Sequence, residues 1–183
     1  MRSCLQQFIL AACFVTVASG AAAQGRVPAT DSGAIGGDVG ILLPRAEVLD
    51  NGPVLDGFYE YYFTPRTSVR VGMGWMNPSF EREDDDSLRT IRVPLDLVYN
   101  WERGEIHPFA GAGLGIYFVQ AKDNGESVGD SETKLGATLF GGAEFFTSRT
   151  VSIKGEARYH IVGDVFGVNP GGLGLSIGVK KYF

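Results

Sequence analysis

Cysteine is scarce in this chain of 183 residues, where it occurs twice, as Cys4 and Cys13. Both cysteines lie in the first 23 residues, so the remaining chain has no disulfide to stabilise it in an oxidising compartment. Long apolar runs are also missing, because the stretch from Leu5 to Val17 is too short to cross a bilayer as a helix. Basic residues are fewer than acidic ones, 16 against 21, and a net charge of −5 excludes a typical nucleic-acid-binding surface.

The first 23 residues are typical of a secretory signal peptide. Arg2 precedes the short apolar run, and a row of alanines ends it. This order predicts Sec-type export, cleavage after Ala23, and a mature chain of residues 24–183 that folds as one domain. A second interpretation is a lipoprotein cleavage box that ends at Cys13 and would make that cysteine a lipidated first residue. The apolar run continues beyond Cys13, which argues against lipidation.

Glycine is abundant, with 26 residues, and aromatic residues make up 11% of the chain. This composition favours strands and tight turns over helices. The clearest local pattern is the stretch 151–161. One set of alternate residues is apolar or small, and the other set is polar or charged: Val151, Ile153, Gly155, Ala157, Tyr159 and Ile161 against Ser152, Lys154, Glu156, Arg158 and His160. A period of two residues predicts a strand with two different faces.

The same alternation recurs along the chain and predicts eight strands near 35–43, 55–63, 69–76, 91–99, 110–118, 135–145, 151–161 and 173–183. Long loops follow the odd-numbered strands and short turns follow the even-numbered ones. This asymmetry is typical of membrane barrels, which have short periplasmic turns and longer external loops. The sequence therefore predicts an all-β fold, an eight-stranded antiparallel transmembrane β-barrel. Pro94 interrupts the fourth strand, and a proline there indicates an edge or a bulge.

Charge decides which face of these strands points outward. The set of alternate residues that is mainly apolar, here called the apolar parity, carries one charged residue, Lys181, near the end of the last strand. The opposite parity carries eleven: Asp38, Asp56, Glu60, Arg70, Arg92, Asp96, Glu144, Lys154, Glu156, Arg158 and Lys180. A Lys or Arg that faces lipid at mid-bilayer costs about 2–4 kcal/mol, so the charged face must line the interior. A soluble barrel would instead have to bury more apolar side chains than eight strands can enclose.

Three segments resemble known proteins: the C-terminal Gly-Leu-Ser-Ile-Gly-Val-Lys-Lys-Tyr-Phe, the glycine-alternating stretch 107–115, and the Tyr-Tyr-Phe-Thr-Pro-Arg turn at 61–66. On these segments the mature chain resembles the small Gram-negative outer-membrane barrels, the OmpA/OmpX-like "outer membrane protein beta-barrel domain" family. The resemblance implies an eight-stranded barrel in the outer membrane, surrounded by lipid and lipopolysaccharide. It also implies that the C-terminal aromatic residue, Phe183, is part of the signal read by the barrel-assembly machinery. Lys181 departs from the apolar residue usual near that signal.

The histidines are weak candidates for catalysis. A catalytic His160 would need a nucleophile and an orienting acid close by. Lipid A deacylase barrels carry a His-x-Ser arrangement on the outer surface, whereas Val162 occupies the serine position here and His160 belongs to the inward parity. His160 is therefore expected to be a hydrogen-bonded histidine of the lumen. His107 precedes a proline beside a turn and is expected to lie at the surface.

Two further patterns have a structural interpretation that outweighs a functional one. Acidic residues crowd the segment 81–86 and could collect divalent cations, but their spacing matches no EF-hand, so a solvated loop is expected: Glu81, Glu83, Asp84, Asp85 and Asp86. Gly111, Gly113 and Gly115 alternate within a strand and so do not form a dinucleotide fingerprint. We expect them to make room for bulky inward neighbours. The sequence thus predicts no catalytic residue, no metal ligand and no cofactor.

The function expected from these patterns is non-enzymatic: a monomeric outer-membrane barrel with a structural or surface-interaction role, an ion-paired lumen, and an external ligand or host surface bound through its loops. A narrow pore for ions or small molecules is the alternative interpretation. An enzyme that modifies lipid A is the third. The architecture alone does not choose between them.

Overall fold

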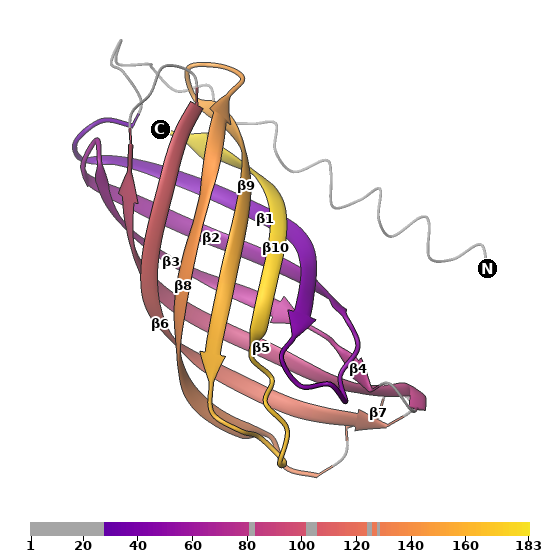
Figure 1. Cartoon of the computed structure of the whole chain (residues 1–183). Helices are drawn as coiled ribbons and strands as arrows, with labels where there is room; N and C mark the ends of the chain where they lie inside the picture. Colours follow the sequence, from indigo (N-terminus) through magenta and orange to yellow (C-terminus); the bar gives the residue numbers. More distant parts are fainter. Residues whose placement is uncertain (1–27, 81–82, 102–105, 124–125, 128) are drawn as a thin grey trace.

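The wall of the molecule is a ring of β-strands (Figure 1). The computed structural model describes residues 28–80, 83–101, 106–123, 126–127 and 129–183, and describes only the backbone at 83–86, 123 and 126–127. These residues form ten strands: β1 (Ser32–Pro44), β2 (Gly52–Thr64), β3 (Thr67–Met76), β4 (Ser79–Phe80), β5 (Glu83–Asn100), β6 (Ile106–Asp123), β7 (Glu126–Ser127), β8 (Glu132–Phe146), β9 (Val151–Val162) and β10 (Gly172–Tyr182).

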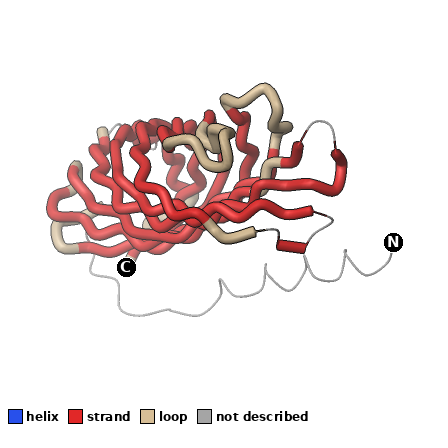
Figure 2. The backbone as a smooth tube through the Cα atoms, turned by 90° about the horizontal axis from the view of Figure 1, so that it is seen from below, coloured by secondary structure: helices blue, strands red, loops and turns tan. Residues whose placement is uncertain are grey.

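Eight of these strands close into an antiparallel barrel. β1 pairs with β2 and with β10, so the first and last strands of the chain are neighbours. The wall continues from β2 to β3 and β5, and from β10 to β9, β8 and β6. Pairing of β5 with β6 completes the ring, and Figure 2 shows the strands curving around it. Within the described residues there is no helix of the length and apolarity needed to cross a bilayer. The predicted eight-stranded barrel is confirmed.

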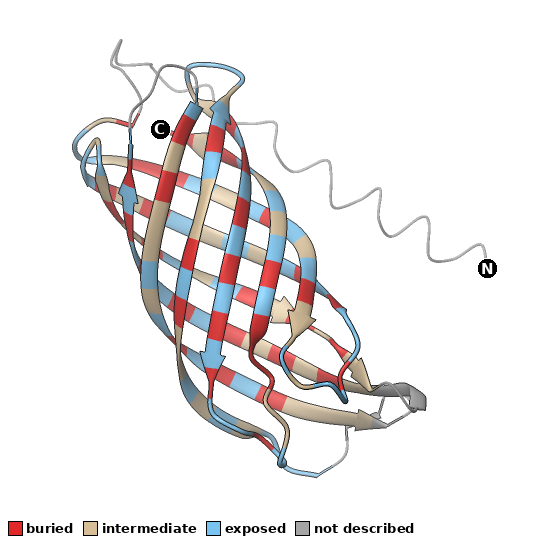
Figure 3. Ribbon diagram, viewed as in Figure 1, coloured by how far each residue is buried: buried red, intermediate tan, exposed pale blue. Residues whose placement is uncertain are grey.

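Burial follows the predicted alternation. Along β9 every second residue from Ser152 to Val162 is buried, and the residues between them are exposed. Figure 3 shows the same alternate bands of buried and exposed residues on the other strands. The reason is the pleat of the strand, which sends successive side chains to opposite faces of the wall. The charged parity points into the barrel and the apolar parity points out.

Two segments predicted as loops are partly strand. The chain is paired from Glu83 in β5 and up to Asp123 in β6, although we expected loops at 77–89 and 120–134. The register of the two strands continues as far as Ser87 opposite Lys122, beyond the apolar alternation. The short strands β4 and β7 add to this extension by pairing with β5 and β6. Backbone pairing needs no apolar face once a hairpin leaves the membrane, so the hydrophobic pattern underestimates strand length there.

Pro94 lies in the middle of β5, at neither an edge nor a bulge of the described wall. It keeps its place in the register with β6, opposite Gly115. On the other side, the register of β3 with β5 omits Gly72 and Met73. A proline has no N–H to donate, so the ladder lacks the bond that position 94 would give to the β3 backbone. The wall therefore has a weak seam at mid-height.

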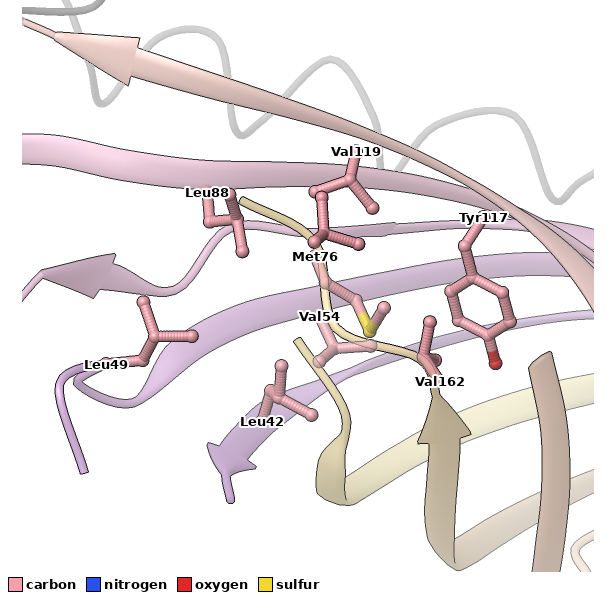
Figure 4. Packing of buried hydrophobic residues seen from close by; sticks show 9 residues of the cluster. Leu42, Leu49, Val54, Met76, Leu88, Tyr117, Val119 and Val162 are labelled. Atoms are coloured by element: carbon pink, nitrogen blue, oxygen red, sulfur yellow. The ribbon is translucent and has the colours of Figure 1, made fainter. Parts of the chain in front are cut away.

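Apolar side chains inside the barrel gather at its two ends. At the loop end they form a cluster contributed by β1, β2, β3, β5, β6, β9 and the adjoining loops: Leu42, Leu49, Val54, Met76, Leu88, Tyr117, Val119, Val162 and Val165. Figure 4 shows these side chains converging from several strands. At the turn end Tyr62, Tyr182 and Ala34 pack together, with Phe146 beside them. A third cluster, Val98, Phe109 and Phe140, lies in the same half. The charged side chains occupy the space between.

Candidate functional site: the barrel lumen

The lumen gathers the eleven charged residues assigned to the inward parity. Ten of them are buried, and the eleventh, Asp56, is half-buried with 13% of its side chain exposed. They come from β1, β2, β3, β5, β8, β9 and β10, because each strand sends alternate residues inward. An isolated charge in such an interior would be very costly, so each must have a partner.

Glu156 is the centre of the network. Its Oε2 atom accepts hydrogen bonds from Arg70 Nη1 at 2.8 Å and from Lys154 Nζ at 2.9 Å. Its Oε1 atom accepts a hydrogen bond from Arg158 Nε at 2.8 Å. Lys154 also reaches Asp38 across the intervening strand β10, with 2.8 Å between Nζ and Oδ2. One carboxylate thus holds three cations, and strands that are not neighbours in the wall become linked through it.

Lys180 is the centre of a second group, at the turn end. Its ammonium contacts Glu60 Oε2 at 2.9 Å and the Tyr62 hydroxyl at 2.9 Å, and it forms an ion pair with Glu144. Glu144 Oε2 also accepts a hydrogen bond from the Tyr182 hydroxyl at 2.5 Å. Lys180 itself is completely buried. Lys180 is on β10, and Glu60 and Glu144 are on β2 and β8. This group therefore links β10 to the strands that lie beyond its two neighbours, β1 and β9.

The two groups are joined and extended by other pairs. Arg70 Nε donates to Glu60 Oε2 at 3.0 Å and so connects the turn-end group with Glu156. Toward the loop end, Arg158 Nη1 donates to Asp96 Oδ2 at 2.8 Å. Arg92 and Asp56 form a separate pair beside this network, in which Arg92 Nη2 donates to Asp56 Oδ2 at 2.7 Å. The network therefore runs through the middle of the lumen from the turn end to the base of the loop-end cluster.

Aromatic rings lie against the cations. The Phe58 ring has Arg70 Cζ at 4.6 Å and Lys154 Nζ at 4.7 Å from its centroid. Arg158 Cζ lies 4.0 Å from the centroid of Phe140. These distances allow cation–π attraction, which is stronger where water is excluded. The rings fill the space that paired ions leave open.

The glycines of β6 make the room that the sequence analysis expected. A Cβ atom at Gly111 would collide with the ring of Phe140, and one at Gly113 would collide with the Asp96 carboxylate. Both neighbours are bulky inward residues of adjacent strands. Their alternation with apolar residues is therefore a packing requirement of the lumen.

His160 is buried and points inward, as predicted. Its Nδ1 atom is 3.1 Å from the Tyr117 hydroxyl, and the two rings meet edge to face. Val162 is buried on the same face and offers no hydroxyl. The arrangement gives His160 a hydrogen-bond partner, as expected for a histidine of the lumen.

The expectation for His107 was wrong. Its side chain is 6% exposed, and its ring centroid lies 4.7 Å from that of Phe146. His107 follows directly on the first residue of β6, opposite Glu144 of β8, so it already belongs to the inward parity. Proximity to a turn suggested the surface, but the pleat decides the direction of the side chain.

For the acidic segment that might collect cations, the structure tests only the backbone of residues 83–86. Glu81 lies outside the described residues, and only the backbone is described at Glu83, Asp84, Asp85 and Asp86. Among the residues whose side chains the structure describes, no three His, Cys, Asp or Glu groups are arranged to hold a metal ion. The backbone at 83–86 is strand β5, so the expected loop is wrong there, whereas the solvation of the acidic side chains stays a prediction.

The outer face of the wall is apolar at mid-height. Leu95 is 58% exposed, Leu139 57% and Ile177 67%. Rings gather near the turn end, where Tyr99 and Trp101 meet edge to face and Tyr59 lies beside Phe183. An exposed apolar band with aromatic borders is the surface that a bilayer requires of a barrel. Lys181 is half-buried at that border.

The comparisons with known proteins agree with this architecture. Neisserial surface protein A, NspA, matches with a TM-score of 0.70 and 16% identity, over 82% of this chain and 97% of that one. The N-terminal barrel domain of Pseudomonas aeruginosa OprF matches with a TM-score of 0.61 and 14% identity, over 84% and 98%. Ail, the attachment invasion locus protein of Yersinia pestis, gives 0.58 and 14%, over 84% and 99%. Ail is also known in complex with the heparin analogue sucrose octasulfate.

Sequence comparison identifies the family. No curated protein sequence matches the chain. The family model described as "Outer membrane protein beta-barrel domain" matches residues 9–180, which is nearly the whole sequence. Together with the closed eight-stranded wall and its apolar outer band, this match shows that the chain belongs to the outer membrane protein beta-barrel domain family.

Proposed function

We propose that the protein is a non-enzymatic surface barrel with a closed, ion-paired lumen, and that its contacts with other molecules are made by its external loops. The observation that carries this proposal is the filling of the lumen along its length. Apolar side chains close the loop end, paired ions fill the middle, and Tyr62, Tyr182 and Phe146 close the turn end. An eight-stranded barrel is narrow enough for side chains to fill its interior.

The charge of the loops indicates what kind of partner they would take. Each of the four segments at the long-loop end has more acidic than basic residues: 45–51, 77–89, 120–134 and 163–171. A surface of one sign attracts partners of the opposite sign and repels those of its own. We therefore infer a cationic partner surface. In this respect the chain would differ from Ail, which has been solved with a polyanion.

Other parts of the proposal concern assembly. Phe183 is 68% exposed beside Tyr59, so its ring is accessible to a barrel-assembly machinery that reads a C-terminal aromatic residue. The signal-like first 23 residues support Sec-type export. The apolar outer band supports a monomer that has lipid and lipopolysaccharide as its neighbours.

A closed lumen makes an electrical prediction. The purified protein, inserted in a planar bilayer, is expected to give no resolvable single-channel current. Insertion is checked on the same sample by the faster gel migration of the unheated barrel. Discrete current steps that scale with the amount of inserted protein would contradict the closed lumen and favour the narrow pore.

The acidic loops make a binding prediction. Protein in nanodiscs is expected to bind a lysine-rich peptide, more weakly as salt rises, and not to bind sucrose octasulfate. The triple variant D84N/D85N/D86N should weaken the peptide contact. The control E102Q/E105Q removes acidic charge from residues 102–105, between β5 and β6 in the sequence, and should leave binding unchanged. Retention of sucrose octasulfate by the unaltered protein would contradict the proposed partner class.

A further inference from the structure

The loop between β9 and β10 contains a tight hairpin. Val165 and Val168 exchange two backbone hydrogen bonds, of 2.8 and 2.9 Å, and enclose Phe166 and Gly167 as a two-residue turn. Val165 is completely buried in the loop-end cluster, and Val168 packs against that cluster. Figure 1 shows this loop extending beyond the end of β9 before it returns to β10. The two valines therefore fix the turn on the barrel.

Side-chain hydrogen bonds hold the base of the same loop. Asn169 Nδ2 donates to the Val162 carbonyl and to Asp164 Oδ1, both at 3.0 Å. Asn169 Oδ1 accepts a hydrogen bond from the Gly171 N–H at 3.0 Å. The conformation of the loop is thus set within this chain and does not depend on a partner. A preorganised surface of this kind loses little conformational entropy when it binds.

The backbone at the tip is unfavourable for the residue that occupies it. Phe166 has a φ angle of 52° and Gly167 has one of 79°. A type I′ turn needs positive φ at both positions, and asparagine, aspartate or glycine usually occupies the first of them. A phenylalanine is strained in this left-handed region, because its Cβ atom approaches the following carbonyl oxygen. Asparagine at position 166 would suit the hairpin better, so the fold does not explain the phenylalanine.

The ring of Phe166 is also exposed. The four segments at the long-loop end contain two aromatic residues, Phe80 and Phe166. Phe80 packs against the loop-end cluster, whereas 47% of Phe166 is exposed. A single exposed apolar side chain is common and needs no explanation by itself. Here the exposure coincides with backbone strain, and residues in sparsely populated backbone regions cluster at sites that bind ligands.

The neighbouring charge indicates which ligand the ring would take. Asp164 is exposed on the other side of the buried Val165, so the hairpin presents a carboxylate and an aromatic ring together. A carboxylate pairs with a cation, and the face of an aromatic ring attracts one. The four segments at the long-loop end all carry more acidic than basic residues. This charge favours a cationic polypeptide and disfavours the negatively charged surface of a membrane.

We propose that Phe166 and Asp164 form a subsite for one lysine or arginine side chain of the partner. The ring face receives the cationic group, and the carboxylate pairs with it. The subsite rests on the cationic partner proposed above, and it specifies which residues hold that partner. The strained backbone of Phe166 then serves to present the ring at the tip of the hairpin.

Binding of a lysine-rich peptide to the protein in nanodiscs tests the ring. F166L keeps an apolar side chain on the same backbone and removes the aromatic face, so peptide affinity should fall about two- to fivefold. F166W is the matched control, because an indole attracts cations at least as well as a phenyl ring, and it should keep the affinity. D164N retains the oxygen that accepts from Asn169 and loses the charge, so the affinity should be lower and depend less on salt.

The urea midpoint of unfolding gives an independent readout. F166N removes the ring and places at the turn a residue that tolerates positive φ. It should therefore unfold at a higher urea concentration than the unaltered protein, while it binds the peptide more weakly. A lower midpoint in F166N would show that Phe166 serves the fold, and it would overturn the subsite.

Two binding results would also overturn the subsite. Equal affinity of F166L and the unaltered protein would show that the aromatic face is not used, and it would leave the cationic partner in place. Attachment of phosphatidylcholine vesicles to the unaltered protein but not to F166N would mark a membrane anchor. Failure of the unaltered protein to bind the peptide would refute the cationic partner itself, and the subsite with it.

Discussion

Replacement of Lys180 by methionine is expected to lower the free energy of unfolding of the barrel by about 3–5 kcal/mol. Methionine keeps most of the length of the side chain and removes the charge. Glu60 retains Arg70 as a cationic partner, but Glu144 loses the cation with which its ion pair is formed. A buried carboxylate without its cation is much more costly than a pair that is absent altogether. Urea titration of the protein refolded in lipid vesicles measures the change.

Adding the substitution E144Q to K180M is expected to restore part of the free energy of unfolding that K180M removes. In the double variant K180M/E144Q the orphaned carboxylate is neutral, so the loss of stability should be smaller than in K180M alone. The loss of stability in the double variant should therefore differ strongly from the sum of the losses in K180M alone and E144Q alone, as is usual for residues in one ionic network. Additive losses in the double variant would mean that Lys180 and Glu144 do not form a pair in the membrane.

Replacement of Ala157 by arginine is expected to cost about 2–4 kcal/mol, although Ala157 is exposed and its side chain is small. Ala157 belongs to the outward parity and lies halfway along β9, one residue from the network centre Glu156. The cost comes from the bilayer, because an arginine there must leave water for hydrocarbon. Urea titration in the same vesicles measures this loss.

The matched control uses the same substitution near the border of the membrane. Val151 is the first residue of β9, at the turn end, and it also belongs to the outward parity. An arginine there can reach the interface, so V151R should cost about 0–1 kcal/mol. Equal effects of A157R and V151R would contradict the depth that the barrel assigns to Ala157.

The alternation of residues was sufficient to predict the strands, the closure and the direction of nearly every charge. The pairs inside the lumen could not be predicted in the same way. Lys154 on β9 and Asp38 on β1 meet over Gly178 of β10, which lies between them, and Arg70 on β3 meets Glu156 on β9 because tilt and stagger bring distant positions to one height. The alternation along a strand shows which face a residue occupies. It does not show the height of that residue along the barrel axis relative to residues of distant strands.

Two other differences have local causes. The extension of β5 and β6 beyond the apolar alternation depends on hairpin pairing above the membrane, for which the sequence carries no period-two signal. His107 was assigned to the surface from its place near a turn, whereas its register opposite Glu144 turns it inward. The gap in the β3–β5 register at Gly72 was also missed. Pro94 indicated an irregularity in the strand. The sequence did not show which neighbouring strand would lose the hydrogen bond that the missing N–H would have donated.

The most direct test of the inside-out barrel is electron paramagnetic resonance of a nitroxide attached at Leu95 in the reconstituted protein. Leu95 points outward from the middle of β5 and is 58% exposed. If lipid surrounds it, dissolved oxygen should relax the label efficiently, and a water-soluble nickel complex should have almost no effect. Efficient relaxation by the nickel complex would place Leu95 in water and contradict the account.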